Sequence, residues 1–296
     1  MSSTIRMNSG CWFPGYSIVD PVSQFLADSA SRFILNYFTP EVSPETSFYE
    51  GVKNLSEREI IQYVQSGHRP PPGQAFKVRK KRDAQTDELD RSTQLEKSIV
   101  VLASGTIFRT GKRKGAPSVP GGNESELLGE GQSKRAFLVE DLNNNRKMAI
   151  TVSKQKIRPC LAEMKKEAFI TNNISSPYIL QVRFYARSTE FLGKKIKTGY
   201  LESEVCDGGT LKDRPELAQD RAIQAQIIKA VADTHQAGFA HLDLGPGNIA
   251  FVKEPNSKLS VRLLDFGNGT SLTPNDGMEE VDAFFLTKIF PGSNDC

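Results

Sequence analysis

Three oxygen-bearing side chains in the last third of the chain constrain its fold more than any other feature. Asp243 is followed five residues later by Asn248, and Asp265 lies a further 17 residues along, at the end of a short apolar segment. Amide and carboxylate oxygens are ligands that Mg²⁺ prefers, and a carboxylate can also take a proton from a hydroxyl. This order predicts a loop and a strand end that meet at a magnesium–nucleotide site.

A glycine-containing turn lies upstream of these residues. Gly129 and Gly131 sit between two short apolar segments, and a tight turn at 141–145 precedes a third. The sequence therefore predicts a strand, loop, strand, turn and strand in that order. Glycines in such a loop let backbone amides approach phosphate oxygens without a Cβ in the way. Alone the pattern is typical of a plain hairpin, but it gains weight from the acids downstream.

Together these segments resemble a eukaryotic-type protein kinase domain over about residues 124–290. Residues 129–139 resemble the glycine-rich loop of that family, residues 241–248 its H-R-D-x-x-x-x-N loop, and residues 265–267 its D-F-G motif. The resemblance implies an α+β, protein-kinase-like bilobal fold. It also implies ATP and Mg²⁺ as cofactors and transfer of the γ-phosphate to a Ser or Thr hydroxyl of a protein substrate.

The resemblance carries roles over to individual residues. Asp243 would be the catalytic base, Asn248 and Asp265 would hold magnesium, and Gly129 and Gly131 would cover the phosphates.

Two further segments match the family between these motifs. Glu167 stands ten residues before Pro177, where the family has the glutamate of its αC helix. Glu204 and Cys206 would offer backbone groups to adenine, and Ser203 would be a small gatekeeper.

The third strand lacks the lysine that normally holds the phosphates, because Thr151 occupies its position. Lys134, in place of the third loop glycine, gives an arrangement similar to that of with-no-lysine kinases. We expect Lys134 to pair with Glu167 and the phosphates, since its long stem can reach the same pocket. Two alternatives stay open: Lys147 takes this role, or Lys134 is a solvated lysine in a pseudokinase.

Other departures bear on activity. Leu242 replaces the arginine of H-R-D. Gly245 replaces the lysine that contacts the transferred group, so one cation that would stabilise that group is missing. The alternative function is a pseudokinase-type nucleotide-binding or protein-docking module without phosphotransfer. An aminoglycoside-type phosphotransferase is disfavoured, because that family usually has glycine at the position of Leu242 and lacks D-F-G.

The segment after Asp265 is short, with only 31 residues. Residues 278–290 predict one helix, in which Asp282 would anchor the catalytic loop. A C-lobe truncated in this way resembles the small effector kinases that pathogenic bacteria inject into host cells. It implies secretion into the host cytoplasm or nucleus, and the alternative location is the cytoplasm of the producing cell. An activating host protein partner, in place of the missing activation loop, stays open.

The chain of 296 residues is expected to have three parts: a helical region at 1–68, a basic flexible linker at 69–122, and a minimal kinase-like domain at 123–296. One helix is predicted between Asp20 and Pro40, and another begins at Ser56. Ile99–Leu102 predicts a single strand within the linker.

Composition excludes several classes of protein. A net charge of +3 over this length does not imply a specific nucleic-acid partner. The four cysteines show no C-x-x-C spacing for zinc, and no apolar run is long enough for a transmembrane segment.

Overall fold

The computed structural model describes most of the chain from residue 44 onward. The described ranges are 44–79, 96–112, 119–120, 127–131, 133–153, 158–191, 194–273 and 277–290. All of them belong to one of two compact units, Val42–Cys296. The helix expected between Asp20 and Pro40 lies outside the described residues. Among those that are described, no helix has the length and apolar character needed to cross a bilayer.

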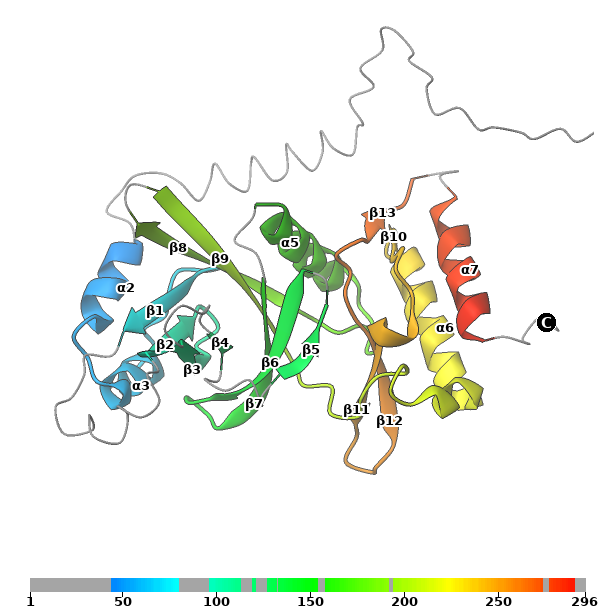
Figure 1. Cartoon of the computed structure of the whole chain (residues 1–296), viewed down its shortest axis with the longest axis horizontal. Helices are drawn as coiled ribbons and strands as arrows, with labels where there is room; N and C mark the ends of the chain where they lie inside the picture. The colour runs from blue at the N-terminus through cyan, green and yellow to red at the C-terminus, as the bar shows by residue number, and fades with distance from the viewer. Residues whose placement is uncertain are drawn as a thin grey trace, which may run out of the picture. The chain divides into compact units, whose positions relative to one another are not determined.

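Two short helices begin the described part (Figure 1). α2 spans Pro44–Val52 and α3 spans Glu57–Gln65. The Glu59 backbone N–H donates to the Ser56 hydroxyl, and the Ser56 N–H donates to the Glu59 carboxylate at 2.7 Å. Gly67 follows α3 with a φ of 98°, a left-handed conformation that glycine adopts readily. The second predicted helix, with its capping box, is therefore confirmed.

Four strands occupy much of the interval predicted to be a flexible linker. They are β1 (Ala75–Arg79), β2 (Glu96–Leu102), β3 (Ile107–Lys112) and β4 (Val119–Pro120), and they form an antiparallel sheet in that order. The linker prediction is wrong over these strands, although the one strand predicted at Ile99–Leu102 is confirmed.

The difference between β2 and β1 explains why only one strand of this sheet was predicted. Ile99 and Val101 pack in one cluster with the buried residues of α2 and α3, whereas Val100 and Leu102 pack in another cluster. A continuous apolar run of this kind is typical of a strand with both faces buried. β1 carries basic residues such as Lys77, so its own composition resembles a solvated linker. Its pairing with β2 defines it as a strand.

A second antiparallel sheet follows, with the order β5-β6-β7-β9-β8. Its strands are β5 (Leu127–Glu130), β6 (Lys134–Asp141), β7 (Arg146–Ser153), β8 (Arg183–Phe191) and β9 (Lys194–Ser203). Helix α5 (Arg158–Asn173) links β7 to β8, and its buried Met164 and Ala168 pack with Val182 and Leu201. One face of this sheet is thus covered by α5.

The first sheet packs on the second. Val100 and Phe108 of the first sheet share a buried cluster with Ile150, Tyr185 and Tyr200 of the second. The rings of Phe108 and Tyr200 meet edge to face, with 5.9 Å between their centroids. The strands of both sheets therefore contribute to one hydrophobic core.

A buried carboxylate also joins the two sheets. Glu202 of β9 accepts hydrogen bonds from Tyr185 Oη at 2.8 Å, from Ser104 Oγ at 3.1 Å and from Thr106 Oγ1. Burial raises the pKa of Tyr185 to about 12, so its hydroxyl keeps the proton that it donates. A buried carboxylate is stable only when its oxygens have partners. The turn that carries Ser104 and Thr106 therefore supplies two of the donors that stabilise the Glu202 carboxylate on β9.

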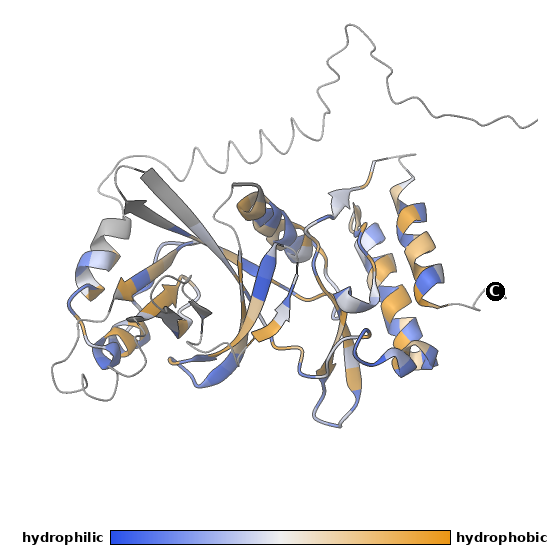
Figure 2. Cartoon of the chain, in the orientation of Figure 1, coloured by the Kyte–Doolittle hydropathy of each residue, from blue (hydrophilic) through white to orange (hydrophobic). Residues whose placement is uncertain are grey.

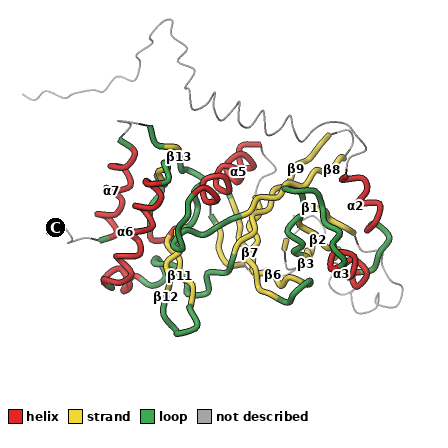
Figure 3. Tube along the Cα trace, turned by 180° about the vertical axis from the view of Figure 1, so that it is seen from behind, coloured by secondary structure: helices red, strands yellow, loops and turns green. Residues whose placement is uncertain are grey.

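The C-terminal part contains two longer helices and two short strand pairs. It consists of η2 (Pro215–Gln219), α6 (Arg221–Gln236), β10 (Phe239–Ala240), η3 (Pro246–Asn248), β11 (Ile249–Lys253), β12 (Leu259–Leu263), β13 (Thr270–Ser271) and α7 (Met278–Ile289). Strand β10 pairs with β13, and β11 pairs with β12. Figure 3 shows α6 and α7 at one end, the two large sheets at the other, and α5 between them.

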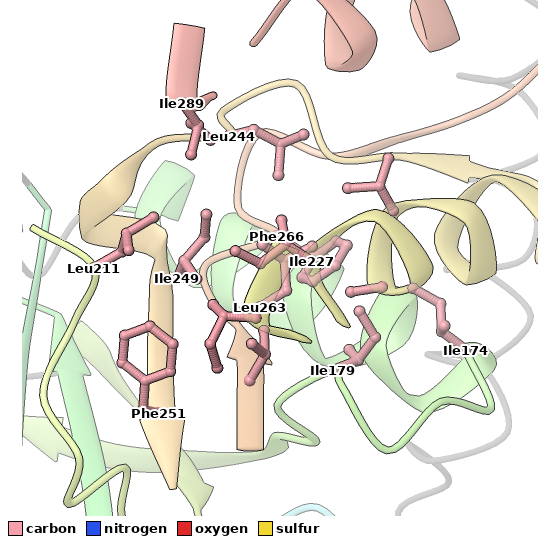
Figure 4. Packing of buried hydrophobic residues seen from close by; sticks show 14 of the residues in the cluster. Ile174, Ile179, Leu211, Ile227, Leu244, Ile249, Phe251, Leu263, Phe266 and Ile289 are labelled. Atoms are coloured by element: carbon pink, nitrogen blue, oxygen red, sulfur yellow. The ribbon is translucent and has the colours of Figure 1, made fainter. Parts of the chain in front are cut away.

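The core of this part connects α5 to the helices. Ile170 of α5 belongs to the same buried cluster as Ile227 of α6, Leu263 of β12 and Phe266. Figure 4 shows Phe266 close to Ile227 and Leu263 in the middle of this cluster. Hydrophobic and polar residues alternate along α6 and α7 in Figure 2, as expected for helices with one buried face. A sheet-rich part followed by a helical part confirms the expected α+β, two-lobed fold.

Phe108→Ala tests whether the first sheet is integral to the fold. The side chain is fully buried between the sheets, so its removal should lower the free energy of unfolding by about 3–5 kcal/mol. Urea unfolding followed by circular dichroism measures this loss. Tyr49→Ala, at a residue with 45% of its surface exposed, is the control and should change stability little. An unchanged midpoint for Phe108→Ala would show that this segment behaves as a linker.

Candidate active site

Lys134 lies at the start of β6, on the same face of the sheet as Thr151. The β6–β7 register pairs Lys134 with Ser153 and Ala136 with Thr151, so these four side chains share one face. Lys134 Nζ lies 2.6 Å from Glu167 Oε2 and 2.5 Å from Asp265 Oδ1. The expected pairing of Lys134 with Glu167 is therefore present, and Asp265 joins it.

The electrostatics of this cluster follow from burial and from two acids sharing one ammonium. Burial opposes the charge on Lys134, but Glu167 and Asp265 outweigh it and raise the pKa of the ammonium above its usual value. Burial also raises the pKa of Glu167, and Lys134 counteracts that effect. Because both lysine and glutamate are buried, each stabilises the other in a place where a single charge would be costly.

Lys147, the alternative candidate, lies elsewhere. It pairs in register with Glu140 near the far end of β7, and its side chain is exposed. It does share the face of Ala149 and Thr151 by alternation, as expected. Within the described residues, however, only Lys134 forms ion pairs with Glu167 and Asp265. The alternative that Lys147 replaces the missing lysine is therefore not supported by the geometry.

The glycine-containing turn joins β5 to β6. Gly131 N donates to Lys134 O at 2.9 Å, and both Gly129 and Gly131 are exposed. A Cβ added at Gly129 would meet no heavy atom within 4 Å, so the surface beside it is open. This open backbone fits the predicted role of a cover over phosphate oxygens.

The catalytic-loop segment is anchored by Asp282 of α7. The buried carboxylate of Asp282 accepts from His241 N and from Leu242 N, each at 2.8 Å, and lies 2.9 Å from His235 Nε2. Leu242 has a φ of 62°, a left-handed conformation that costs a non-glycine residue about 1–2 kcal/mol. The two hydrogen bonds hold this strained backbone, so the predicted anchoring role of Asp282 is confirmed by its contacts.

His241 connects the catalytic loop to the segment around Asp265. Its Nε2 lies 2.8 Å from Leu264 O, and Asp243 N donates to its Nδ1 at 3.2 Å. Burial lowers the pKa of His241, which favours the neutral ring. In that form Nδ1 accepts and Nε2–H donates, which satisfies both contacts. The ring also packs against Phe266, with 4.5 Å between the ring centroids.

Asp265, two residues after the end of β12, is held in a strained conformation. Its φ is 56°, and Gly267 N donates to its Oδ1 at 3.2 Å. Leu264 N donates to Asn248 O at 2.8 Å, which places Asp265 beside the loop that carries Asp243 and Asn248. Strained non-glycine residues cluster at functional sites, and here Leu242 and Asp265 place one in each of the two motifs.

Asn248 and Asp265 have the chemistry of a magnesium site. The Asn248 amide Nδ2 donates to Asp243 O at 2.8 Å, which leaves its Oδ1 as a ligand atom. Among the described residues, no group of three or more His, Cys, Asp or Glu side chains could hold a metal by itself. Mg²⁺ at nucleotide sites usually takes one or two carboxylates and completes its shell with phosphates and water. The residues present therefore fit Mg²⁺ that binds together with a nucleotide.

The segment after β9 was predicted to contact adenine. Glu204 directs its side chain to Arg262, with 2.5 Å between Oε1 and Nε. Burial raises the pKa of the Cys206 thiol to about 12, and the nearby carboxylate of Glu204 adds to the shift. Within the described residues, neither the carbonyl of Glu204 nor the amide of Cys206 takes part in a backbone–backbone hydrogen bond. The Cys206 amide is thus available to a ligand, and the Glu204 carbonyl, which accepts from Ser203 Oγ at 3.1 Å, keeps one further lone pair for it.

Sequence comparison is consistent with this geometry. A family model for the protein kinase domain matches residues 123–290, more than half of the chain. The chain belongs to the protein kinase domain family. The kinase domain therefore contains all the predicted site residues. They lie in one ion-paired cluster (Lys134, Glu167, Asp265), one loop (Asp243, Asn248), the glycine turn (Gly129, Gly131) and the segment after β9 (Glu204, Cys206).

Individual relatives are also kinases by name. The kinase domain is similar to maternal embryonic leucine zipper kinase of Xenopus laevis, with 31% identity over 149 residues. It is 32% identical over 149 residues to CBL-interacting serine/threonine-protein kinase 12 of Arabidopsis thaliana. Each match covers 48% of the chain, and 21% and 28% of the relative, respectively. The chain thus spans under a third of the length of these relatives.

One contact of Asp243 was not predicted from the sequence. Asn268, directly after the D-F-G segment, donates from Nδ2 to Asp243 Oδ2 at 3.3 Å. The sequence places Asn268 in a polar connector, where an asparagine usually indicates only a turn. Nothing in its spacing from Asp243, 25 residues away, indicates that the two side chains meet.

Asp282→Asn should destabilise the kinase domain. The change keeps the shape of the side chain, but it puts an amide where two backbone N–H groups need acceptors. Loss of a buried charged acceptor should lower stability by about 3 kcal/mol and weaken Mg–ATP binding. Thermal unfolding and nucleotide titration measure these effects. Glu279→Gln, an exposed acid-to-amide change on the same helix, is the matched control. Equal stability of both variants would contradict the anchoring role.

Proposed function

We propose that the protein is an ATP-dependent Ser/Thr protein kinase. The observation that carries the proposal is Lys134, which contacts Glu167 and Asp265 at once although it comes from β6. A kinase site needs a lysine at the phosphates, oriented by the αC glutamate, near the acid that holds magnesium. The ion pairs assemble these parts without the usual third-strand lysine. The names of the relatives support Ser or Thr as acceptors.

The chemistry requires positioning more than covalent catalysis. The acceptor hydroxyl oxygen bonds to the γ-phosphorus while the bond to the β-phosphate oxygen breaks, and ADP leaves. Asp243, which is exposed, would accept the hydroxyl proton. Lys134 would hold phosphate oxygens, and the turn at Gly129 and Gly131 would cover them. Magnesium, held by Asn248 and Asp265 when bound, supplies neutralisation of the phosphate charge.

A second candidate is a nucleotide-binding or protein-docking module without phosphotransfer. It is favoured by Gly245, which leaves the catalytic loop without the lysine that usually contacts the transferred group. Incubation with Mg²⁺, γ-labelled ATP and a protein mixture separates the two functions. Label on protein that disappears in Asp243→Ala supports the kinase. Nucleotide binding without any transfer supports the module.

Lys134→Met tests the lysine arrangement. Removal of the only cation between Glu167 and Asp265 in the described cluster should reduce phosphate transfer about 100-fold or more. Lys147→Met, at an exposed position on the adjacent strand, is the matched control and should retain full transfer. Initial rates with labelled ATP measure both. Full activity of Lys134→Met would contradict the proposal that Lys134 holds the phosphates.

Action on host proteins, secretion and activation by a host protein stay predictions. Their support is the resemblance to small effector kinases and the polar composition of residues 1–9, which lie outside the described residues. The labelling experiment in the presence and absence of host-cell extract tests activation. A rate that is the same in both conditions would speak against an activating partner.

A further inference from the structure

Asp243 receives two side-chain hydrogen bonds on the same oxygen. Asn268 Nδ2 donates to its Oδ2 at 3.3 Å, and Asn248 Nδ2 lies 3.4 Å from that oxygen. The shorter contact of Asn248 is with the Asp243 backbone carbonyl, at 2.8 Å. Among the described residues, no recorded donor reaches Oδ1. One oxygen of the carboxylate is therefore occupied and the other is open.

From this geometry we infer that Asn268 is a positioning residue for the catalytic base. The inference rests on the proposed kinase function. Asp243 is exposed, and rotation about the bond to its carboxylate is soft, so burial does not fix the carboxylate plane. An amide donor at Oδ2 restricts that rotation and presents Oδ1 to the acceptor hydroxyl. Because the amide is neutral, it orients the base without placing a competing charge beside it.

The backbone around Asn268 is fixed by the same elements that fix Asp243. On its C-terminal side, Gly269 N donates to Phe266 O at 3.0 Å, and β13 then pairs with β10. Strand β10 leads directly into His241 and Asp243. Leu272 N also donates to Gly238 O at 2.8 Å, at the other end of this short ladder. One pair of strands thus sets the distance between the asparagine and the base.

Close packing leaves this connection little freedom. A Cβ added at Gly269 would lie 3.0 Å from Ala240 O, 3.0 Å from Ile170 Cδ1 and 3.2 Å from Phe266 O. Gly269 therefore lets the chain pass close to β10 and to α5. The side chain of Asn268, in contrast, is exposed to solvent, and its amide contacts Asp243. An exposed side chain on a fixed backbone is better suited to contact Asp243 than to fill space in the core.

The test uses the full chain and variants of similar size. Asn268→Leu keeps the branched shape of the side chain but removes the donor, and Asn268→Asp replaces the donor with a second carboxylate. A general base contributes about 100-fold to 10,000-fold, so loss of its orientation should cost less, about 10-fold in kcat. KM for ATP should stay within about two-fold, because Asn268 contacts the base and none of the predicted phosphate ligands. Asn268→Gln, which keeps the amide, should recover part of kcat.

A double-mutant cycle with Asp243→Ala separates positioning from a structural role. If Asn268 acts through Asp243, Asn268→Leu causes no further loss of the residual rate in the Asp243→Ala background. Asn256→Leu, at an exposed asparagine in the β11–β12 turn, is the matched control and should leave kcat unchanged. Thermal unfolding of each variant should match that of the unmodified protein.

The outcomes distinguish this inference from the proposed function. An unmodified protein that transfers phosphate, together with an Asn268→Leu variant of equal kcat, overturns the role of Asn268 alone. An additive loss in the double mutant, or a fall in thermal stability that accounts for the lost rate, also overturns it. An unmodified protein that binds Mg–ATP and transfers nothing overturns the kinase function and this inference with it.

Discussion

The ammonium of Lys134 joins three segments that are far apart in the sequence, and the proposed nucleotide site depends on that contact. β6 supplies the lysine, α5 supplies Glu167, and the segment after β12 supplies Asp265. Two carboxylates share one cation, so the cluster carries a net negative charge. Addition of Mg²⁺ would make it positive, which suits phosphate oxygens. The same contact therefore stabilises the buried charges of Lys134 and Glu167, and with Mg²⁺ it would suit the proposed nucleotide.

The strand register explains how a lysine from β6 can replace one from β7. Side chains alternate along a strand, and Lys134, Ala136, Thr151 and Ser153 lie on one face. Diagonal neighbours on adjacent strands are about 7–8 Å apart at most, within reach of a lysine stem. The sequence predicted this role for Lys134 through the resemblance to with-no-lysine kinases and the length of a lysine stem. It could not exclude Lys147, which shares the same face, because exposure at the end of β7 depends on the tertiary fold.

Residues with a fixed local spacing were predictable, and residues whose partners are distant were not. Asp243, Asn248 and Asp265 belong to motifs whose spacing follows from one loop and one strand. The sheet of β1–β4 was mistaken for a linker because its strands are defined by pairing and by burial on both faces, which a charged sequence around Lys77 conceals. Asn268 was missed for the same reason, since its contact depends on the β10–β13 pair.

The two faces of the second sheet have different partners, and the adjacent residues Glu202 and Ser203 of β9 point to opposite faces. Glu202 pairs in register with Ile150 and accepts hydrogen bonds from Ser104 and Thr106 in the β2–β3 turn. Ser203 pairs with Ala149, on the face of Lys134 and Thr151. Because successive side chains of a strand point to opposite faces, the backbone between them cannot shift on one face alone. Ser104 and Thr106 donate to Oε1 of Glu202, whereas Tyr185 donates to Oε2, so Oε1 loses these donors when the turn is displaced. Packing of the first sheet therefore fixes the end of β9, from which the chain continues to Glu204 and Cys206, the groups expected to meet adenine.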